Sequence, residues 1–373
     1  MTISLLTAKY PNTIGAWVAE MAFDVAEPIR ESVLRETRSA TLGYNDPVSI
    51  AAARESVARR MATCYGWDVT PSAVAFVSDV VSGFAATLRH FLPEGAAVVV
   101  PTPAYGPLLT VPHLTGHRVV TVPGKSGPHG HGLDFDGIER ALAAGGLLVV
   151  LVNPHNPTGR VYTREELSRL EQLVDAHHAR VFADEIHAPI TLDGRPHLPY
   201  ASLSEIAAAH TITATSASKA WNTSGLKCAQ LIFSSPADVR TWDKVADFYV
   251  RSVSRLGVAA LLTAYEDLEA QKWLDETLSR LRHNKATVYS AVNNGMPSVV
   301  HHPVEATYLA WLDCRALHLD EPATYFREHA GVALTDGSEF GEPGHVRLNF
   351  ALPDARLDAA LNGLARAVTR LRA

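Results

Sequence analysis

Two lysines lie close together in a segment rich in hydroxyl residues. The segment "TSASKAWNTSGLK" begins where the apolar run "TITAT" (211–215) ends, and it carries Lys219 and Lys227 eight residues apart. The chain has only seven lysines against 26 arginines, so two in one segment need an explanation. A lysine amine can bind a carbonyl compound covalently and move protons, whereas a lysine ammonium can neutralise an anion.

Polar side chains also follow two other apolar runs. "RVFADEIH" (180–187) ends with Asp184 and His187, and "LLVVLVNPHNPTG" (147–159) ends in a turn that contains Asn156. Ligands of doubly wound sheets lie beyond the carboxyl ends of the strands, so these side chains are expected to converge with Lys219. An acid, an amide and a lysine suit a cofactor with a ring nitrogen, a phenolic oxygen and an aldehyde. Pyridoxal phosphate has all three groups.

Each of these residues, taken alone, also has an ordinary structural role. Asp184 can cap a helix, and Asn156 can belong to a turn. His187 can be a hydrogen-bonded interior histidine, and Lys219 can mark a strand end that faces solvent. Their joint occurrence, each at the end of a different apolar run, favours a common site.

The pattern of apolar runs predicts an α/β fold with a doubly wound, mostly parallel seven-stranded sheet. Continuously apolar runs are typical of strands buried on both faces, and segments with helical spacing lie between them. One of these segments opens with Thr163 and has Glu166 three residues later, which predicts a capping box. The predicted strands are 74–78, 96–102, 117–122, 147–153, 180–186, 211–215 and 229–234.

After residue 236 the pattern changes to long helices, followed by strand-like runs at 306–313 and 345–352. This change predicts a second, smaller α/β domain. We expect an N-terminal arm at 1–39 that packs on the small domain, a large domain at 40–260 and the small C-terminal domain at 261–373.

Composition excludes several classes of partner. There are 33 basic and 39 acidic residues, a net charge of −6, and no basic cluster, so a nucleic-acid partner is not expected. No apolar run is long enough to span a membrane and no basic leader is present, which predicts a cytoplasmic protein. The three scattered cysteines are expected to be reduced thiols, buried or half-buried. "GPHGHG" (127–132) is expected to be a polar loop, and no metal site is predicted.

Longer motifs carry a resemblance to a known family. They are "NPHNPTG", "DEIH", "SASKAWNTSGLKCA", "ATYLAWLD" and "GSEFGEPGHVRLNFALP". Together they resemble the fold type I, class I/II aminotransferase family. Within it they are similar to the branch of cystathionine β-lyases and cysteine-S-conjugate β-lyases of the maltose-regulon modulator type. The resemblance runs from "WVAEMAF" (17–23) to "RLNFALP" (347–353) and implies pyridoxal 5'-phosphate as the cofactor.

The resemblance implies a role for each residue around the cofactor ring. Lys219 matches the lysine that holds the cofactor covalently and then moves protons. Asp184 matches the carboxylate that pairs with the pyridine nitrogen, and Asn156 the amide that holds the phenolate oxygen. His187 stands where relatives have a second contact to that oxygen, and Tyr105 in "PTPAYGP" is similar to the aromatic residue that stacks on the ring.

The same resemblance implies a phosphate cradle. It consists of the backbone N–H groups of Val80 and Val81, where a helix opens in "SDVVSGF", together with Ser216 and Lys227. Tyr44 in "LGYNDP" resembles a tyrosine that reaches the phosphate from a neighbouring subunit, which implies a homodimer with active sites at the subunit interface.

Arg347 in "HVRLNF" matches the arginine that binds the substrate α-carboxylate, a task that suits a bidentate guanidinium. The sequence departs from the branch at three places. Glu20 and Ala22 stand where acidic residues are usual at both positions, Asp79 stands where glycine is common beside the phosphate, and "AYGPLL" replaces a more usual Tyr-Pro-Pro-Phe. These departures leave the shape and polarity of the substrate open.

The activity implied by the branch is a carbon–sulfur β-elimination. It would convert an L-cysteine S-conjugate or a cystathionine-like amino acid to a thiol, pyruvate and ammonia. An aminotransferase that uses the same groups is the alternative. A catalytically idle regulator of the same fold is a third hypothesis, which the joint presence of Lys219, Asp184, Asn156 and Arg347 disfavours.

Overall fold

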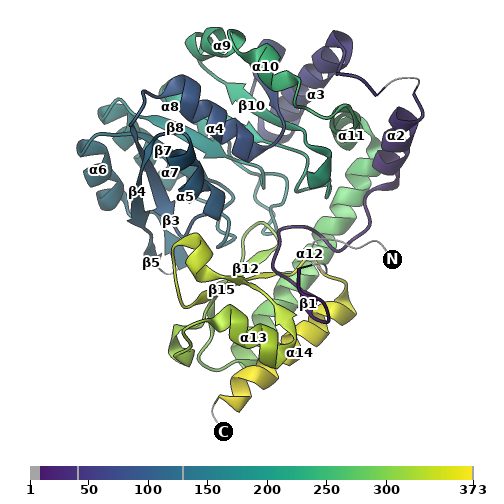
Figure 1. Cartoon of the computed structure of the whole chain (residues 1–373), viewed down its shortest axis with the longest axis vertical. Coiled ribbons are helices and arrows are strands. Elements are labelled where there is room, and N and C mark those ends of the chain that lie inside the picture. Colours follow the sequence, from purple (N-terminus) through teal and green to yellow (C-terminus); the bar gives the residue numbers. More distant parts are fainter. Residues whose placement is uncertain (1–8, 40–41, 128–129, 372–373) are drawn as a thin grey trace.

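The chain forms a large unit and a smaller C-terminal unit, joined by the long helix α12 (Leu268–Gly295), which runs from one into the other (Figure 1). The structure is a computed structural model that describes residues 9–39, 42–127 and 130–371. The predicted boundary between residues 260 and 261 lies inside helix α11 (Arg255–Glu266).

The large unit is built on a seven-stranded sheet with the order β2-β10-β9-β8-β7-β3-β4. All neighbouring strands are parallel except β10, which runs antiparallel to both β2 and β9. The prediction of a doubly wound, mostly parallel seven-stranded sheet is therefore confirmed. The strands are β2 (Val74–Val77), β3 (Ala97–Thr102), β4 (Arg118–Pro123), β7 (Gly146–Val152), β8 (Arg180–Asp184), β9 (Thr211–Thr215) and β10 (Ala229–Phe233).

Helices cover both faces of this sheet, which explains why its strands are continuously apolar. Along β3, Val98 and Val100 join the core on one face, and Val99 joins the core on the other. One face is covered by α4 (Val80–Phe91), α5 (Gly106–Leu114) and α9 (Pro236–Asp243). The other is covered by α6 (Phe135–Ala143), α7 (Arg164–Ala176) and α8 (Glu205–His210). Helix α7 begins with the predicted capping box between Thr163 and Glu166.

The small unit contains a four-stranded antiparallel sheet with the order β11-β12-β15-β14. The strand predicted at 306–313 begins later, because Thr307 has a φ of +68° and an extended strand cannot include it. The elements of the small unit are β11 (Val300–His301), β12 (Leu309–Asp313), α13 (Pro322–Ala330), β13 (Val332–Ala333), β14 (Thr335–Asp336), β15 (His345–Asn349) and α14 (Asp354–Arg370).

The N-terminal arm contacts both the small unit and the helices that join the units. Its strand β1 (Ile14–Gly15) pairs in parallel with β13, and its helix α2 (Glu27–Thr37) packs against α11 and α12. Helices α3 (Pro47–Tyr65) and α10 (Ala246–Val250) complete the large unit.

The histidine-rich segment differs from its prediction as a loop. Strands β5 (Lys125–Gly127) and β6 (Gly130–Gly132) pair in antiparallel fashion, and residues 128–129 lie outside the described residues. Gly130 supports this geometry, because its φ of +84° is easily adopted only by glycine. The thiol of Cys64 is exposed rather than buried, whereas Cys228 and Cys314 are buried. No helix in the described ranges is long and apolar enough to cross a bilayer.

Candidate active site

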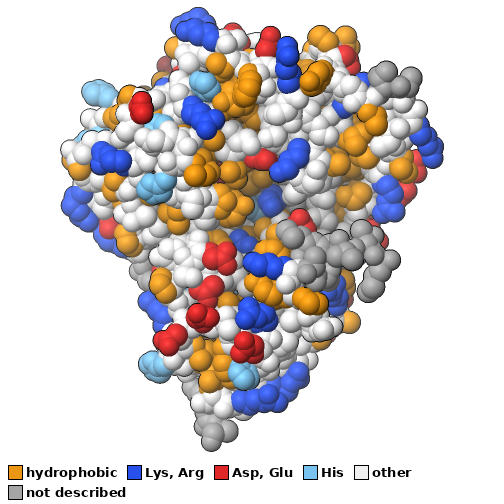
Figure 2. All heavy atoms as spheres, in the orientation of Figure 1, with side chains coloured by type: hydrophobic (Ala, Val, Ile, Leu, Met, Phe, Trp, Pro, Cys, Tyr) orange, Lys and Arg blue, Asp and Glu red, His pale blue; other side chains and the backbone are white. Residues whose placement is uncertain are grey.

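A pocket of about 590 Å³ opens between the large and small units, beyond the carboxyl ends of β7, β8 and β9. Figure 2 shows the hollow where the two units meet, with basic side chains inside it. Small-molecule sites usually measure about 300–1,000 Å³, so the pocket has a suitable size. Ten of the eleven predicted site residues line it: Val80, Val81, Tyr105, Asn156, Asp184, His187, Ser216, Lys219, Lys227 and Arg347.

Lys219 follows β9 and points its amine into the pocket. Nζ donates a hydrogen bond of 2.8 Å to the carbonyl oxygen of Ala19, which is a neutral partner. Burial lowers the pKa of Lys219 to about 8, and the positive charge of Arg347 acts in the same direction. An amine with this pKa has a far larger neutral fraction near physiological pH than an ordinary lysine has, so Lys219 can act as a nucleophile or as a base.

Asp184 is the last residue of β8 and is only 6% exposed. Burial raises its pKa to about 6, although the N–H of Ile186 donates to Oδ1 over 3.2 Å and lowers it again in part. Burial removes the water that stabilises a charged carboxylate, and a cationic ligand group would stabilise the charged form in its place. Asp184 is therefore suited to a protonated ring nitrogen.

Asn156 and Arg347 meet in the pocket although they come from different units. Nη1 of Arg347 donates to Oδ1 of Asn156 over 3.0 Å. Nη2 donates to the carbonyl oxygen of Trp17 over 2.6 Å and to Oγ1 of Thr335 over 3.2 Å. All three acceptors are uncharged, so the guanidinium keeps its positive charge available for a ligand. Burial lowers the pKa of Arg347 only to about 10, and the group stays protonated at neutral pH.

His187 and Tyr105 also line the pocket. His187 is buried, its pKa is lowered to about 3 by burial, and its Nδ1 has no hydrogen-bond partner in the described part of the chain. A buried ring nitrogen without a partner is costly, so this atom is suited to a polar ligand group. Tyr105 immediately precedes α5 and is 37% exposed, so part of this residue is accessible from the pocket that it lines.

Helix α4 points its N-terminus at the pocket. Its first residues are Val80 and Val81, whose N–H groups have no partner within the helix, and the helix dipole favours an anion there. Lys227 lies beside this terminus, but its Nζ is 3.0 Å from Oδ2 of Asp79. The hydroxyl of Ser216 donates to the carbonyl oxygen of Cys228 over 2.7 Å. A phosphate would therefore compete with these protein partners.

Tyr44 does not line the pocket of its own chain. It precedes α3 and is 75% exposed. Its predicted contact with the phosphate of a neighbouring subunit remains a prediction.

The N-terminal arm supplies a wall of the pocket that the sequence did not indicate. Trp17 and Ala19 contribute backbone carbonyls to Arg347 and Lys219. The side chain of Asn222 holds the arm in place, since its Oδ1 accepts from the N–H of Met21 over 3.0 Å and its Nδ2 donates to the Met21 carbonyl over 2.9 Å. Asn222 in "SKAWNTSG" is half-buried, and the sequence alone did not indicate these contacts.

The residues present fit pyridoxal phosphate. The pocket offers a low-pKa lysine for the aldehyde, a buried acid for the ring nitrogen and an amide for the phenolic oxygen. A helix N-terminus with a lysine beside it is available for the phosphate. The unpaired Nδ1 of His187 agrees with this fit. A sheet of this order with these groups at its carboxyl edge defines the fold type I class of pyridoxal phosphate enzymes.

Comparisons with known proteins agree with this class. Residues 18–364 match the family described as aminotransferase class I and II. Cystathionine beta-lyase of Corynebacterium glutamicum is 34% identical, with 97% of this chain and 96% of the relative covered. Protein MalY of Escherichia coli is 28% identical, with 95% and 91% covered. A structure of a pyridoxal-phosphate-bound C–S lyase from Staphylococcus hominis has a TM-score of 0.91 and 26% identity, with 98% and 96% covered.

The chain therefore belongs to the aminotransferase class I and II family. The family depends on pyridoxal phosphate, so the predicted cofactor and the predicted family are both confirmed.

Proposed function

We propose that the chain is a pyridoxal-phosphate-dependent carbon–sulfur β-lyase. It acts on an L-cysteine S-conjugate or a cystathionine-like amino acid and, with one water, yields a thiol, pyruvate and ammonia. One observation carries the proposal: Lys219, with its lowered pKa, and Arg347, held only by uncharged oxygens, line the same pocket. The printed names of the relatives support a lyase.

Arg347 binds the α-carboxylate of the amino acid in this proposal. Its guanidinium is fixed by Asn156, Trp17 and Thr335, so it loses little conformational freedom when a carboxylate binds. A fixed guanidinium can bind the two carboxylate oxygens side by side, which orients the Cα–H bond.

Lys219 acts on that bond. Bound pyridoxal phosphate supplies an electron sink that makes the Cα proton acidic. Nζ of Lys219 removes this proton and can then deliver it to the departing sulfur, so that a thiol leaves. The carbonyl oxygen of Ala19 accepts a hydrogen bond from Nζ and thereby helps to orient the amine. Asp184 keeps the ring nitrogen protonated, because its carboxylate is stabilised by the adjacent positive charge.

The charges around the pocket disfavour a substrate whose side chain carries an unaccompanied carboxylate, such as aspartate. Among the described lining residues the cations are Lys219, Lys227 and Arg347, each of which already has a role, and Glu339 adds a negative charge. A side-chain carboxylate that stands alone, as in aspartate, would meet no free cation there, whereas the distal carboxylate of cystathionine brings its own ammonium group. The ring centroid of Phe340 lies 4.9 Å from the Arg347 guanidinium, so this part of the pocket wall is apolar and adds no cation. This argument favours the lyase over an aspartate aminotransferase.

We also propose a homodimer, in which Tyr44 of one subunit reaches the phosphate site of the other. Tyr44 and Val48 are 75% and 78% exposed, and large side chains of this kind are often covered in an assembly. In a symmetric dimer, Tyr44 of each subunit would lie at the phosphate site of the other subunit.

Substrate turnover tests the proposed reaction. The purified holoenzyme is given cystathionine or an S-alkyl cysteine without any oxo acid, and free thiol and pyruvate are measured together. Equal amounts of both support the lyase. Rapid amino transfer from alanine or glutamate to an added 2-oxo acid, with no thiol from any S-conjugate, would replace it by the aminotransferase. A protein without visible absorption and without either activity would be the idle regulator.

A further inference from the structure

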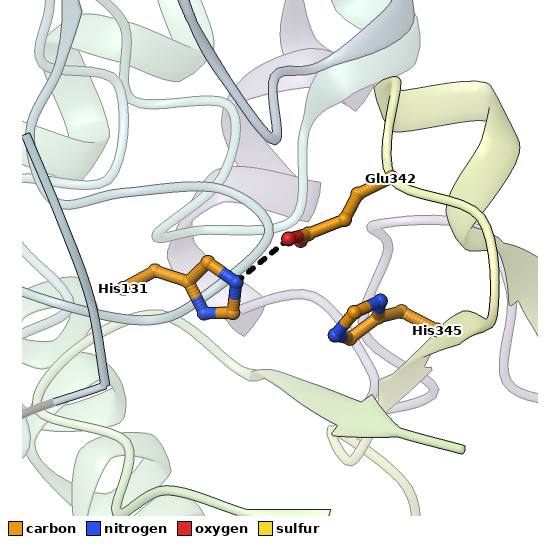
Figure 3. A group of neighbouring side chains, drawn as sticks. All are labelled: His131, Glu342 and His345. Carbon is orange, nitrogen blue, oxygen red and sulfur yellow. Dashed lines mark hydrogen bonds and ion pairs between the residues drawn. The ribbon is translucent and has the colours of Figure 1, made fainter. Parts of the chain in front are cut away.

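Three potential metal ligands meet at the junction of the two units, outside the active-site pocket. His131 comes from β6, Glu342 follows the short helix Gly337–Phe340, and His345 opens β15. One ligand atom from each lies within 4.8 Å of the others, and none of the three residues lines the pocket. Figure 3 shows the side chains of His131 and Glu342 in contact, with the ring of His345 beside them.

The contacts of Glu342 leave one of its oxygens facing the histidines. Trp311 donates from Nε1 to Oε2 over 3.2 Å, so this oxygen has a fixed neutral partner. Oε1 lies 2.9 Å from Nε2 of His131. A carboxylate that is anchored through one oxygen and free to bind through the other is typical of metal sites, where surrounding hydrogen bonds orient the ligands.

His345 is held with one ring nitrogen unused. Its Nδ1 lies 3.3 Å from the carbonyl oxygen of Pro343, which can only accept, so Nδ1 carries the proton. The ring stacks on Trp311 with an interplanar angle of 6° and a centroid distance of 5.2 Å, which fixes its orientation. Nε2 therefore presents a lone pair, the form of imidazole that binds a metal.

This Nε2 atom is buried and has no hydrogen-bond partner within the described residues. The side chain of His345 is 0% exposed, and the nearest acidic oxygen, Oδ1 of Asp313, is 3.8 Å away. That oxygen already accepts from Nε of Arg315 over 2.9 Å. An unsatisfied buried polar atom costs about 1–3 kcal/mol, so the ion pair between His131 and Glu342 alone does not explain this arrangement.

We propose that His131, Glu342 and His345 bind one divalent transition-metal ion of the zinc class. Two imidazole nitrogens and one carboxylate oxygen, with a water in the fourth position, form a common zinc ligand set. Tetrahedral bonds of about 2.0–2.2 Å place ligand atoms about 3.4 Å apart. His131 and Glu342, now 2.9 Å apart, would separate slightly, and His345 would approach by roughly 1 Å. His131 and Glu342 are 13% and 27% exposed, which leaves a path for the ion and a place for the water.

A metal here would tie strand β6 of the large unit to the sheet of the small unit. The site adjoins the wall of the active-site pocket, because Trp311 packs edge-on to Phe340 with centroids 5.2 Å apart. Phe340 in turn lies against Arg347. The bound ion would hold the two units together beside the arginine that we assign to the substrate carboxylate.

Binding of zinc to the holoenzyme tests the site directly. After treatment with a chelator and its removal, Zn²⁺ is titrated by calorimetry, and thermal unfolding is followed in parallel. We expect one tight Zn²⁺ per chain and a rise in Tm that saturates at this ratio. Glu342→Gln keeps the shape and the contact to Trp311, and His131→Asn removes a partly exposed ligand from β6. Each should weaken binding at least about 100-fold, because loss of orienting partners alone costs 10–100-fold.

Two matched variants control for surface binding. His113→Asn removes an exposed histidine on α5, and Cys64→Ser removes the exposed thiol, so both should bind Zn²⁺ as the wild-type protein does. The readout is metal binding and is independent of the proposed lyase activity. The proposal is wrong if the wild-type protein binds Zn²⁺ only as weakly as the His131→Asn and Glu342→Gln variants do, or does not bind it. It is also wrong if Zn²⁺ leaves Tm unchanged.

Discussion

Replacing Asp184 by asparagine should stabilise the cofactor-free protein and weaken its hold on pyridoxal phosphate. Burial raises the pKa of Asp184 from 3.8 to about 6, so the fold disfavours the charged carboxylate. At 1.36 kcal/mol for each pKa unit, this rise corresponds to about 3 kcal/mol. Asparagine has nearly the same shape, carries no charge and can still accept the hydrogen bond from Ile186.

The sign and the pH window follow from linkage. Because the folded pKa lies above the unfolded value, the penalty is absent below about pH 3.8, grows between pH 3.8 and 6, and is complete above pH 6. Relative to wild type, the Asp184→Asn apoprotein should gain roughly 1–2 kcal/mol in unfolding free energy at pH 5 and about 3 kcal/mol at pH 8. With the cofactor bound the order should reverse, since only a carboxylate stabilises a protonated ring nitrogen.

Urea unfolding at both pH values, with and without pyridoxal phosphate, measures these differences. The reasoning fails if the apoprotein variant is no more stable than wild type at pH 8. It also fails if the variant retains the cofactor as tightly as wild type does.

Other substitutions test the remaining roles. Lys219→Ala should lower kcat at least about 10²–10⁴-fold, measured by pyruvate release, and near-normal turnover would refute the role of this lysine. In wild type, the rate at which apoprotein takes up pyridoxal phosphate should rise with pH through about 8, since the neutral amine of Lys219 is the reactive form; a flat profile would contradict this. Arg347→Lys should lower kcat/KM about 10–100-fold, because one ammonium replaces a bidentate guanidinium, and an unchanged value would exclude carboxylate binding there. Mixed dimers of Lys219→Ala and Tyr44→Ala chains should recover about a quarter of the wild-type activity through hybrid sites, whereas no recovery would rule out a shared site.

The sequence predicted the sheet and most of the pocket because both depend on side-chain patterns. Apolar runs identified the seven strands, since burial on both faces excludes polar residues from them. Lys219, Asp184 and Asn156 were predictable because the ends of neighbouring parallel strands converge. Their individual roles toward the cofactor remain predictions.

Other features were beyond the reach of the sequence. Ala19 and Trp17 act through backbone carbonyls, which every residue type possesses, so no motif reveals them. The strand start at Leu309 depends on the φ of Thr307, which a β-branched residue would not suggest. His131 and Glu342 are 211 positions apart, and only the packing of the two units brings them together.

Reduction of the purified protein with borohydride, followed by mass mapping of its peptides, tests the central claim most directly. The account predicts that the visible absorption disappears and that a phosphopyridoxyl group is found on Lys219, with none in the Lys219→Ala variant. The same group on Lys227 or on another lysine, or its absence from every lysine in a protein prepared with pyridoxal phosphate, would contradict the assignment of this pocket.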